Sequence, residues 1–156
     1  MEIRPAEKED ASNIIGLVAE IWAEYDCVLD AENEDKYLLA PGEYFRSRGG
    51  NFWIVAEKDE IIATVGVMML DDETAELKSL YVHKNFRKQG LGKRLVELVI
   101  NFARRKKAKK LALWSDTRFG KAHRLYERMN FERCGRRELD DLNNSTEFGF
   151  EKSLTD

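Results

Sequence analysis

The sequence predicts an α/β (α+β) fold in which helices flank one mixed, mostly antiparallel sheet of six to seven strands. Three observations support this class. Short β-rich runs alternate with amphipathic helical patterns, hairpin-length turns separate the central strands, and a strand–helix–strand unit compatible with parallel pairing follows them. The chain has 156 residues and no internal repeat or linker, so we expect residues 1–156 to form a single domain around one core.

The first third of the chain predicts a strand and a long helix. Glu2–Pro5 is a short strand that stops at proline, and apolar residues recur at helical spacing from about Lys8 to Tyr25. The pattern weakens after this helix. Short helices are expected there, around Asp35–Leu39 and Glu43–Arg48.

Three strands follow, separated by two short acidic turns. They are Phe52–Glu57, Ile61–Leu70 and Thr74–Val82, and the first is nearly continuous in apolar residues, as expected of a buried strand. Turns of this length join antiparallel neighbours, so we expect these strands to form a meander.

The second half begins with a long amphipathic helix at Gly90–Lys107, whose leucines share one face. A short apolar strand at Leu111–Trp114 completes the strand–helix–strand unit, which favours parallel pairing with the strand before the helix. The chain then predicts a helix at about Phe119–Met129 and two closing strands, Glu132–Glu138 and Thr146–Lys152, joined by a turn-rich segment.

The composition is that of an ordinary folded protein, with 43% hydrophobic and 35% charged residues. The N-terminus has no apolar signal-peptide core, and no run approaches the ~18 apolar residues of a membrane helix, so we expect a cytoplasmic protein without a membrane partner. Cys27 and Cys134 are too few for a disulfide framework. With only His83 and His123 besides, we expect no metal site, and both histidines are expected at the surface.

Charge is distributed unevenly along the chain, although the net charge is only −3. Residues 1–35 contain eleven acidic and two basic side chains, whereas residues 87–128 contain fourteen basic and three acidic ones. A basic half suits a polyanionic cofactor and an acidic half suits a cationic substrate; the alternative is that both are solvated faces. The basic run Arg104–Lys110 is expected at a helix C-terminus in solvent rather than on nucleic acid.

The segment between the fourth predicted strand and the long helix can hold an anion. Leu80–Val82 end the strand, a basic loop follows, and Gly90 and Gly92 open the helix. Free N–H groups at a helix start attract phosphate, and glycine lets a ligand approach the backbone closely. A Walker A loop is excluded because Lys93 follows only G-L-G, and a dinucleotide fingerprint is excluded because Leu95 stands where its last glycine would be. Alone, the segment could also be a glycine-capped helix start with scattered surface charges.

Two motifs resemble those of the GNAT superfamily of acyl-CoA-dependent N-acetyltransferases. R-K-Q-G-L-G at Arg87–Gly92 matches the family pattern R/Q-x-x-G-x-G/A, and Ala122–Phe131 is similar to the family signature A-x-x-L-Y-x-x-x-G-F. The predicted order of strands and helices is also the family's order, so the resemblance covers essentially the whole chain. It implies the family fold, acetyl-CoA (coenzyme A) as co-substrate without a metal, and a homodimer as a possible assembly.

The resemblance also implies where the cofactor lies. In the family, the glycine-rich loop binds the pyrophosphate of coenzyme A, and a bulge or splay in the fourth strand lets main-chain groups contact the acetyl and pantetheine groups. The implied cofactor-binding residues are Leu80, Tyr81, Val82, Arg87, Lys88, Gln89, Gly90, Leu91, Gly92, Lys93, Phe119 and Ala122.

The sequence departs from the family pattern at two positions. Asn130 replaces the glycine before the final aromatic residue, which is a mild change because asparagine also tolerates the left-handed backbone conformation. Phe119 stands where many members have an asparagine that hydrogen-bonds the pantetheine arm. That interaction is either lost here or replaced by Thr117, Arg118 or Lys121.

Transfer of an acetyl group from a thioester to an amine calls for an acid at the leaving thiolate and a base at the amine. Tyr126 is the candidate acid, since a phenol of pKa ~10 can protonate a thiolate whose conjugate acid has a pKa near ~8.5. The alternative for Tyr126 is a core aromatic residue. Glu76 and Asp116 both lie near the point where their strands would diverge, and we favour Glu76 as the base; acidic surroundings and water could also carry the proton away.

The sequence therefore predicts an acetyl-CoA-dependent N-acetyltransferase that acts on a primary amine of a small molecule or peptide in a ternary complex. Glu20, Glu24 or Asp26 of the acidic arm are possible acceptor contacts. The departure at Phe119 favours an alternative, a non-catalytic acyl-CoA-binding or sensor domain of the same fold. A nucleic-acid-binding module is disfavoured by the overall acidic balance and by the lack of aromatic residues among the basic ones.

Overall fold

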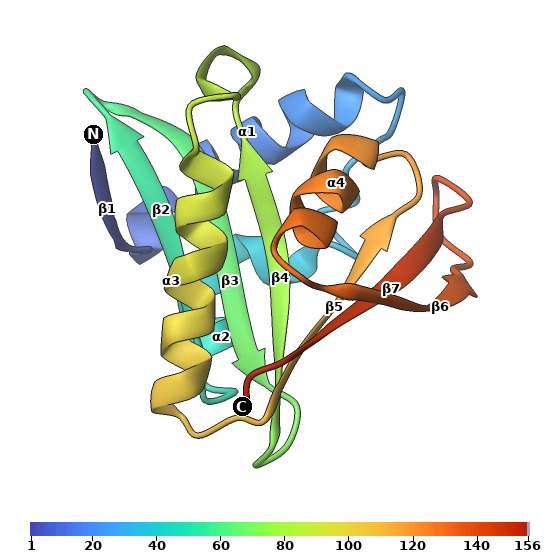
Figure 1. Cartoon of the computed structure of the whole chain (residues 1–156). Helices are drawn as coiled ribbons and strands as arrows, with labels where there is room; N and C mark the ends of the chain where they lie inside the picture. The colour runs from blue at the N-terminus through green and yellow to red at the C-terminus, as the bar shows by residue number, and fades with distance from the viewer. Residues whose placement is uncertain (156) are drawn as a thin grey trace.

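The computed structural model describes residues 1–155, which form seven strands, four α-helices and three short 3-10 turns around one sheet (Figure 1). The strands are β1 (Glu2–Pro5), β2 (Asn51–Glu57), β3 (Glu60–Met69), β4 (Thr74–Val82), β5 (Lys110–Asp116), β6 (Glu132–Glu138) and β7 (Thr146–Ser153). The helices are α1 (Ala11–Ala23), α2 (Pro41–Arg46), α3 (Leu91–Arg105) and α4 (Gly120–Arg128), with 3-10 turns η1 (Lys8–Asp10), η2 (Lys36–Leu39) and η3 (Lys84–Phe86).

The sheet has the strand order β1-β2-β3-β4-β5-β7-β6, and β4 and β5 form its parallel pair. The other neighbours are antiparallel. The predicted mixed, mostly antiparallel sheet, its meander and its strand–helix–strand unit are thus confirmed. The fifth strand is longer than predicted because Ser115 and Asp116 continue to pair with Phe148 and Glu147 of β7.

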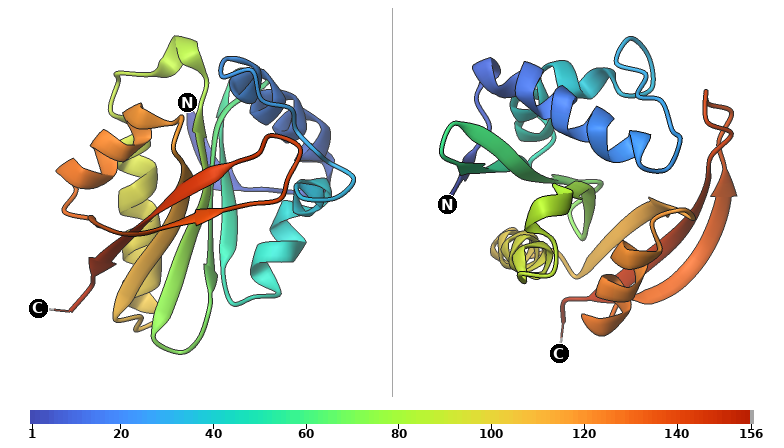
Figure 2. Two further views of the ribbon diagram at one scale, coloured as in Figure 1. Left: turned by 90° about the vertical axis from the view of Figure 1, so that its right-hand side faces the viewer. Right: turned by 90° about the horizontal axis from the view of Figure 1, so that it is seen from above.

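Helices cover both faces of the sheet (Figure 2). On one face, α3 buries Leu95 and Val99 in a core that also contains Tyr126 of α4. On the other face, α1 and α2 bury residues such as Ile14 and Phe45 against the first half of the sheet. The periodic apolar positions of the helices account for this arrangement, because each helix buries the stripe that its sequence carries.

The sheet opens between its two parallel strands. Pairing of β4 with β5 runs from Thr74 to Glu76 on one strand and from Lys110 to Ala112 on the other, and the strands diverge beyond it (Figure 1). The first four strands of the sheet order, β1 to β4, and the last three, β5, β7 and β6, therefore form two wings that meet along a short seam.

A β-bulge interrupts β4 where the sheet opens. Thr64 of β3 pairs with Tyr81 and Gly66 pairs with Lys78, so Ser79 and Leu80 together oppose one residue. Ser79 adopts a left-handed backbone with φ of 60°. The extra residue shifts the alternation of side chains, so that Leu80 packs toward α3 whereas Tyr81 packs toward α1.

The positions of one histidine and one tryptophan differ from what their sequence surroundings indicate. His123 was expected at the surface, but it is buried on α4, where its Nε2 lies 3.0 Å from the hydroxyl oxygen of Ser115. The indole of Trp114, at the end of the apolar run predicted as the fifth strand, is 37% exposed and lies under the guanidinium of Arg137, 4.3 Å from the ring centre. Both residues lie on the second wing, whose curvature the local pattern does not encode.

Candidate active site

A cavity of about 1060 Å³ occupies the opening between β4 and β5. It extends from the end of α1 and the glycine-rich loop to α4 and the segment joining β6 to β7. The structure brings nearly all predicted site residues together along its wall, and Gln89, which is exposed, lies outside it. The lining residues from the prediction are Glu76, Leu80, Tyr81, Val82, Arg87, Lys88, Gly90, Leu91, Gly92, Lys93, Phe119, Ala122 and Tyr126.

The glycine-rich loop presents a helix start to this cavity. Gly90 is the N-cap of α3 and has a left-handed backbone, with φ of 78°. The first intrahelical bond runs from the Arg94 N–H to the Gly90 carbonyl, so the N–H groups of the three residues between them have no helical partner. A Cβ on Gly92 would lie 3.2 Å from the side chain of Leu125, so glycine here permits close packing of α3 on α4. Such a helix start is suited to bind phosphate.

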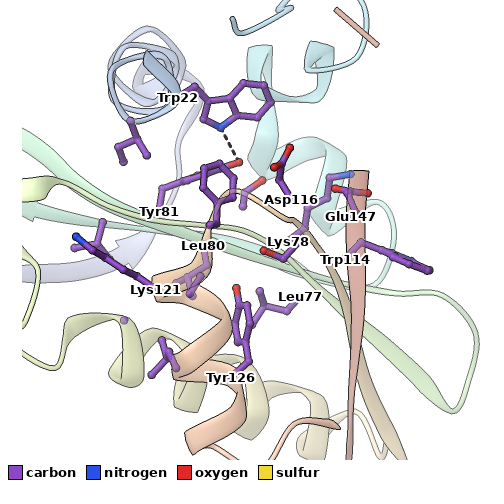
Figure 3. A pocket seen from close by; sticks show the side chains of 18 of the residues that line it. Trp22, Leu77, Lys78, Leu80, Tyr81, Trp114, Asp116, Lys121, Tyr126 and Glu147 are labelled. Carbon is purple, nitrogen blue, oxygen red and sulfur yellow. Dashed lines mark hydrogen bonds between the residues drawn. The ribbon is translucent and has the colours of Figure 1, made fainter. Parts of the chain in front are cut away.

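Cationic side chains surround the helix start. They come from the loop and from one side of α4, and their charges suit a polyanion. Those that line the cavity are Lys88, Lys93, Lys121, Arg124 and Arg128, with Lys121 labelled in Figure 3.

Arg87 already has protein partners. Its Nε donates to the carbonyl of Val82 at 2.9 Å, and its two terminal nitrogens donate to the carboxylate of Glu24 at 2.8 and 2.9 Å. This pairing lowers the pKa of Glu24. Arg87 thus fastens the loop to the end of α1, and Glu24, one of the residues considered as an acceptor contact, faces the loop instead. Glu20 similarly lies 3.5 Å from His83.

The bulged part of β4 lies at the centre of the cavity. Beyond Glu76 no strand pairs with β4 on its β5 side within residues 1–155, so the main-chain groups of Leu80–Val82 on that side can meet a ligand, except the Val82 carbonyl that Arg87 occupies. On the opposite side the bulge is held by a bond from the Thr64 hydroxyl to the Ser79 carbonyl at 2.8 Å.

Tyr126 reaches this point from α4. Its ring is 4% exposed and packs between Phe131 and Phe150, with ring centres 5.6 and 5.5 Å away. The hydroxyl points toward Leu77 and Leu80 (Figure 3), and no hydrogen bond joins it to another group of residues 1–155. Burial raises the pKa of Tyr126 well above its usual value. The phenol therefore stays protonated and can act as a donor into the cavity.

Glu76 lies on β4 near the base of the splay. Its carboxylate forms no ion pair within residues 1–155, and burial raises its pKa, an effect that Lys78 and Arg137 oppose. Asp116, the other candidate base, is engaged: it accepts bonds from the Arg118 backbone at 2.9 Å and from the Arg118 guanidinium at 3.1 Å. The geometry thus leaves Glu76 the more available carboxylate.

The wall beside Glu76 contains residues that sequence reasoning missed. The ammonium of Lys78 lies over the ring of Tyr37, 4.9 Å from its centre, and the Tyr37 hydroxyl is 2.7 Å from that of Ser79. Arg137 of β6 donates to Glu147 of β7 at 2.7 Å. A signal for the bulge was present in the sequence, because the apolar residues of β4 step by two up to Leu77 and then by three to Leu80.

The two departures from the motif have clear structural settings. Asn130 adopts φ of 68°, the left-handed conformation that its replacement of glycine required. Phe119 is the N-cap of α4, and its ring meets Tyr25 edge-on at 4.9 Å and Tyr81 at 6.4 Å. A contact between aromatic rings therefore occupies the position where many family members have an asparagine side chain.

Two further features of residues 1–155 bear on the chemistry. They contain no cluster of three or more His, Cys, Asp or Glu side chains arranged to hold a metal ion. None of their helices is both long and apolar enough to cross a membrane.

Comparison with known proteins identifies one family. Residues 15–131 match the Acetyltransferase (GNAT) family. Human N-acetyltransferase 8 is 31% identical over 120 residues, which cover 73% of this chain and 51% of the relative. N-acetylaspartate synthetase of Danio rerio is 30% identical over 114 residues, covering 72% of this chain and 39% of the relative. The chain spans about half the length, or less, of these curated relatives.

Solved structures share the fold along nearly the whole chain. An acetyltransferase from Streptococcus agalactiae superposes with a TM-score of 0.83 at 24% identity, covering 95% of this chain and 96% of that one. A GNAT-family acetyltransferase from Staphylococcus aureus gives 0.85 at 20% identity, with 99% of both chains covered. A Salmonella typhimurium protein described as a putative acetyltransferase with its cofactor acetyl-CoA gives 0.76 at 18% identity, covering 99% and 94%.

Proposed function

Because the chain belongs to the GNAT acetyltransferase family, we propose that it transfers the acetyl group of acetyl-CoA to a primary amine of a small molecule or peptide within a ternary complex. The observation that carries this proposal is the meeting of three features on one cavity. These are the free helix start of α3, the bulge of β4 and the hydroxyl of Tyr126.

The cofactor end of the cavity has the groups that coenzyme A needs. The helix start at Gly90 and the surrounding cations suit the pyrophosphate, and the strand edge after Glu76 suits the amides of the pantetheine arm. The Salmonella typhimurium structural neighbour, described with its cofactor acetyl-CoA, supports this assignment.

The placement of the side chains supports the following course for the reaction. The amine nitrogen attacks the thioester carbonyl, and main-chain N–H groups of the bulge stabilise the oxyanion that forms. The carbon–sulfur bond breaks, Tyr126 donates its proton to the departing thiolate, and Glu76 accepts the amine proton through water. Both side chains line the same cavity, on opposite sides of the splay. The name of one curated relative contains N-acetylaspartate, so aspartate belongs among the acceptors to be tested.

The test has a binding step and a turnover step. Acetyl-CoA should raise the melting temperature, and thiol release should then identify acceptors in a panel of amines and amino acids. Tyr126→Phe should lower kcat about 10- to 100-fold while the Kd of acetyl-CoA changes less than about twofold, because only the proton donor is removed. Phe131→Leu, which alters the packing beside the same ring, is the matched control. Unchanged turnover in Tyr126→Phe would contradict its role as the acid.

A second candidate is a non-catalytic acyl-CoA-binding or sensor domain. Phe119 favours it, because an aromatic ring replaces the expected pantetheine ligand, and so does Arg87, whose guanidinium is already paired with Glu24. Thermal stabilisation by acetyl-CoA without thiol release to any amine of the panel would support the sensor over the enzyme.

A further inference from the structure

One side of the cavity is crossed by a bridge between segments far apart in the sequence. The loop after α1 passes over the splay and meets the segment between β6 and β7 (Figure 2). We call this bridge the clasp and define it by Tyr25, Cys27 and Val28 on one side and by Arg118, Phe119 and Asn143 on the other.

The central link of the clasp is a reciprocal pair of hydrogen bonds. The Val28 N–H donates to Oδ1 of Asn143 at 2.8 Å, and Nδ2 of Asn143 donates to the Val28 carbonyl at 2.8 Å. The side-chain amide thus takes the place of a neighbouring strand and satisfies both main-chain groups of one residue. Such a pair fixes the separation and the orientation of the two segments.

Arg118 and Phe119 strengthen this link from the β5–α4 turn. One terminal nitrogen of Arg118 donates to Sγ of Cys27 at 3.1 Å, and the other donates to the Asn143 carbonyl at 2.7 Å. The ring of Phe119 packs edge-on against Tyr25 at 4.9 Å. Three separate segments are therefore joined at one place, and Phe119 gains a structural reason for standing where relatives have an amide.

The segment from Trp22 to Tyr37, which contains the clasp residues Tyr25, Cys27 and Val28, is also hydrogen-bonded to β4. The indole N–H of Trp22 donates to the Tyr81 hydroxyl at 3.0 Å (Figure 3). Further along, the Tyr37 hydroxyl lies 2.7 Å from that of Ser79 at the bulge. This segment is thus bonded to β4 on one side of the cavity and to the β6–β7 segment on the other.

We propose that the clasp restricts the acceptor to small free amines and excludes peptide chains. This inference rests on the proposed acetyl transfer and specifies its acceptor. Tyr81 and Glu76 face the clasp side of β4, whereas Leu80 and Val82 face α3, so acceptor and cofactor approach the bulge from opposite sides. Cys27 and Asn143 border the cavity, and the bonds between Val28 and Asn143 close the wall on this side, so a polypeptide could extend across it only if these bonds broke.

The test compares one amine in two contexts. The most reactive free amine of the acceptor panel is measured beside the same amine group carried on an extended blocked peptide. We expect kcat/KM for the free amine to exceed that for the peptide by at least about 100-fold. Asn143→Ala should reduce this ratio of the two kcat/KM values at least about tenfold without changing the Kd of acetyl-CoA. Asp140→Ala, an exposed change in the same segment, is the control and should leave the ratio as it is. Arg118→Met, which keeps the aliphatic stem, provides a second way to open the clasp.

Three results would overturn the inference. They are a wild-type enzyme that accepts the peptide as well as the free amine, a ratio that neither clasp variant changes, and a Val28 amide that exchanges hydrogen as fast in the wild type as in Asn143→Ala. The exchange measurement needs no turnover. A chain that binds acetyl-CoA and protects Val28 but acetylates no amine would instead contradict the proposed function, and the acceptor class would fall with it.

Discussion

At the scale of single residues, burial raises the pKa of both Tyr126 and Glu76, but the consequences differ. A phenol with a raised pKa remains a proton donor over the working pH range. A carboxylate with a raised pKa becomes a better match to a base working near neutral pH. The two residues are therefore suited to the different roles proposed for them, because their ordinary pKa values lie on opposite sides of neutrality.

The proposed base predicts a specific pH profile. In the wild type, kcat/KM should rise along a limb that lies above the usual carboxylate range, followed by a second limb at higher pH from the amine itself. Glu76→Gln should remove the lower limb and reduce turnover about 10- to 100-fold at neutral pH. A lower limb that persists in Glu76→Gln would assign the base elsewhere.

The raised pKa of Glu76 also affects the stability of the fold, and this effect gives a control that is independent of catalysis. Because the pKa of Glu76 is higher in the folded chain than its ordinary 4.5, the folded state binds this proton more tightly than the unfolded state does. Its contribution to the free energy of unfolding is fully present below the unfolded pKa and is lost as pH rises through the folded pKa. Glu76→Gln should therefore raise the urea midpoint relative to wild type at pH 8, and this gain should disappear at pH 4.

At the scale of elements, the β4 bulge sets which main-chain groups face the cavity in the proposed mechanism, and it depends on the left-handed backbone of Ser79. A β-branched residue resists positive φ at a cost of about 1–2 kcal/mol, whereas glycine adopts it freely. Ser79→Val should lower kcat at least about tenfold and reduce stability by about that amount, and Ser79→Gly should keep most of the activity. Both changes remove the contact with Tyr37, so comparison of kcat between them isolates the backbone. Equal loss in the two variants would show that the hydroxyl matters instead.

The helices, the strands and the glycine-rich loop were predictable from the sequence because their signals are local. Helical spacing located α3 and α4, and the motif at Arg87–Gly92 placed the loop between β4 and α3. The partner of Arg87 was not predictable, since Glu24 lies 63 residues away and belongs to another element. Asn143 and Val28 are separated by 115 residues, and an asparagine in a turn-rich segment carries no sign of so distant a contact.

At the scale of the whole molecule, charge is unevenly distributed along the cavity wall. Lys93, Lys121 and Arg128 line the cavity near the helix start of α3, whereas Glu76 and Glu147 lie on the wall beside the cations Lys78 and Arg137. The uneven charge of the sequence thus reappears as an uneven charge along the cavity wall. Glu20 and Glu24 of the acidic N-terminal segment are instead paired with His83 and Arg87 beside the loop. A wall whose excess positive charge lies at the helix start orients a ligand that carries its negative charge at one end and a neutral thioester at the other.

This charge distribution predicts that salt weakens cofactor binding only by screening the attraction between the cations and the phosphates. Raising sodium chloride from roughly 50 mM to roughly 500 mM should increase the Kd of acetyl-CoA about tenfold, because screening reduces attraction between exposed cations and the polyanion. Acetyl-pantetheine has the same reactive end without phosphates, so its weaker Kd should change little over the same range. Lys121→Gln should reduce the salt dependence for acetyl-CoA, and Lys58→Gln, on the distant β2–β3 turn, should not. Calorimetric titration measures all of these, and equal salt dependence for the two thioesters would show that the basic end of the cavity does not select the phosphates.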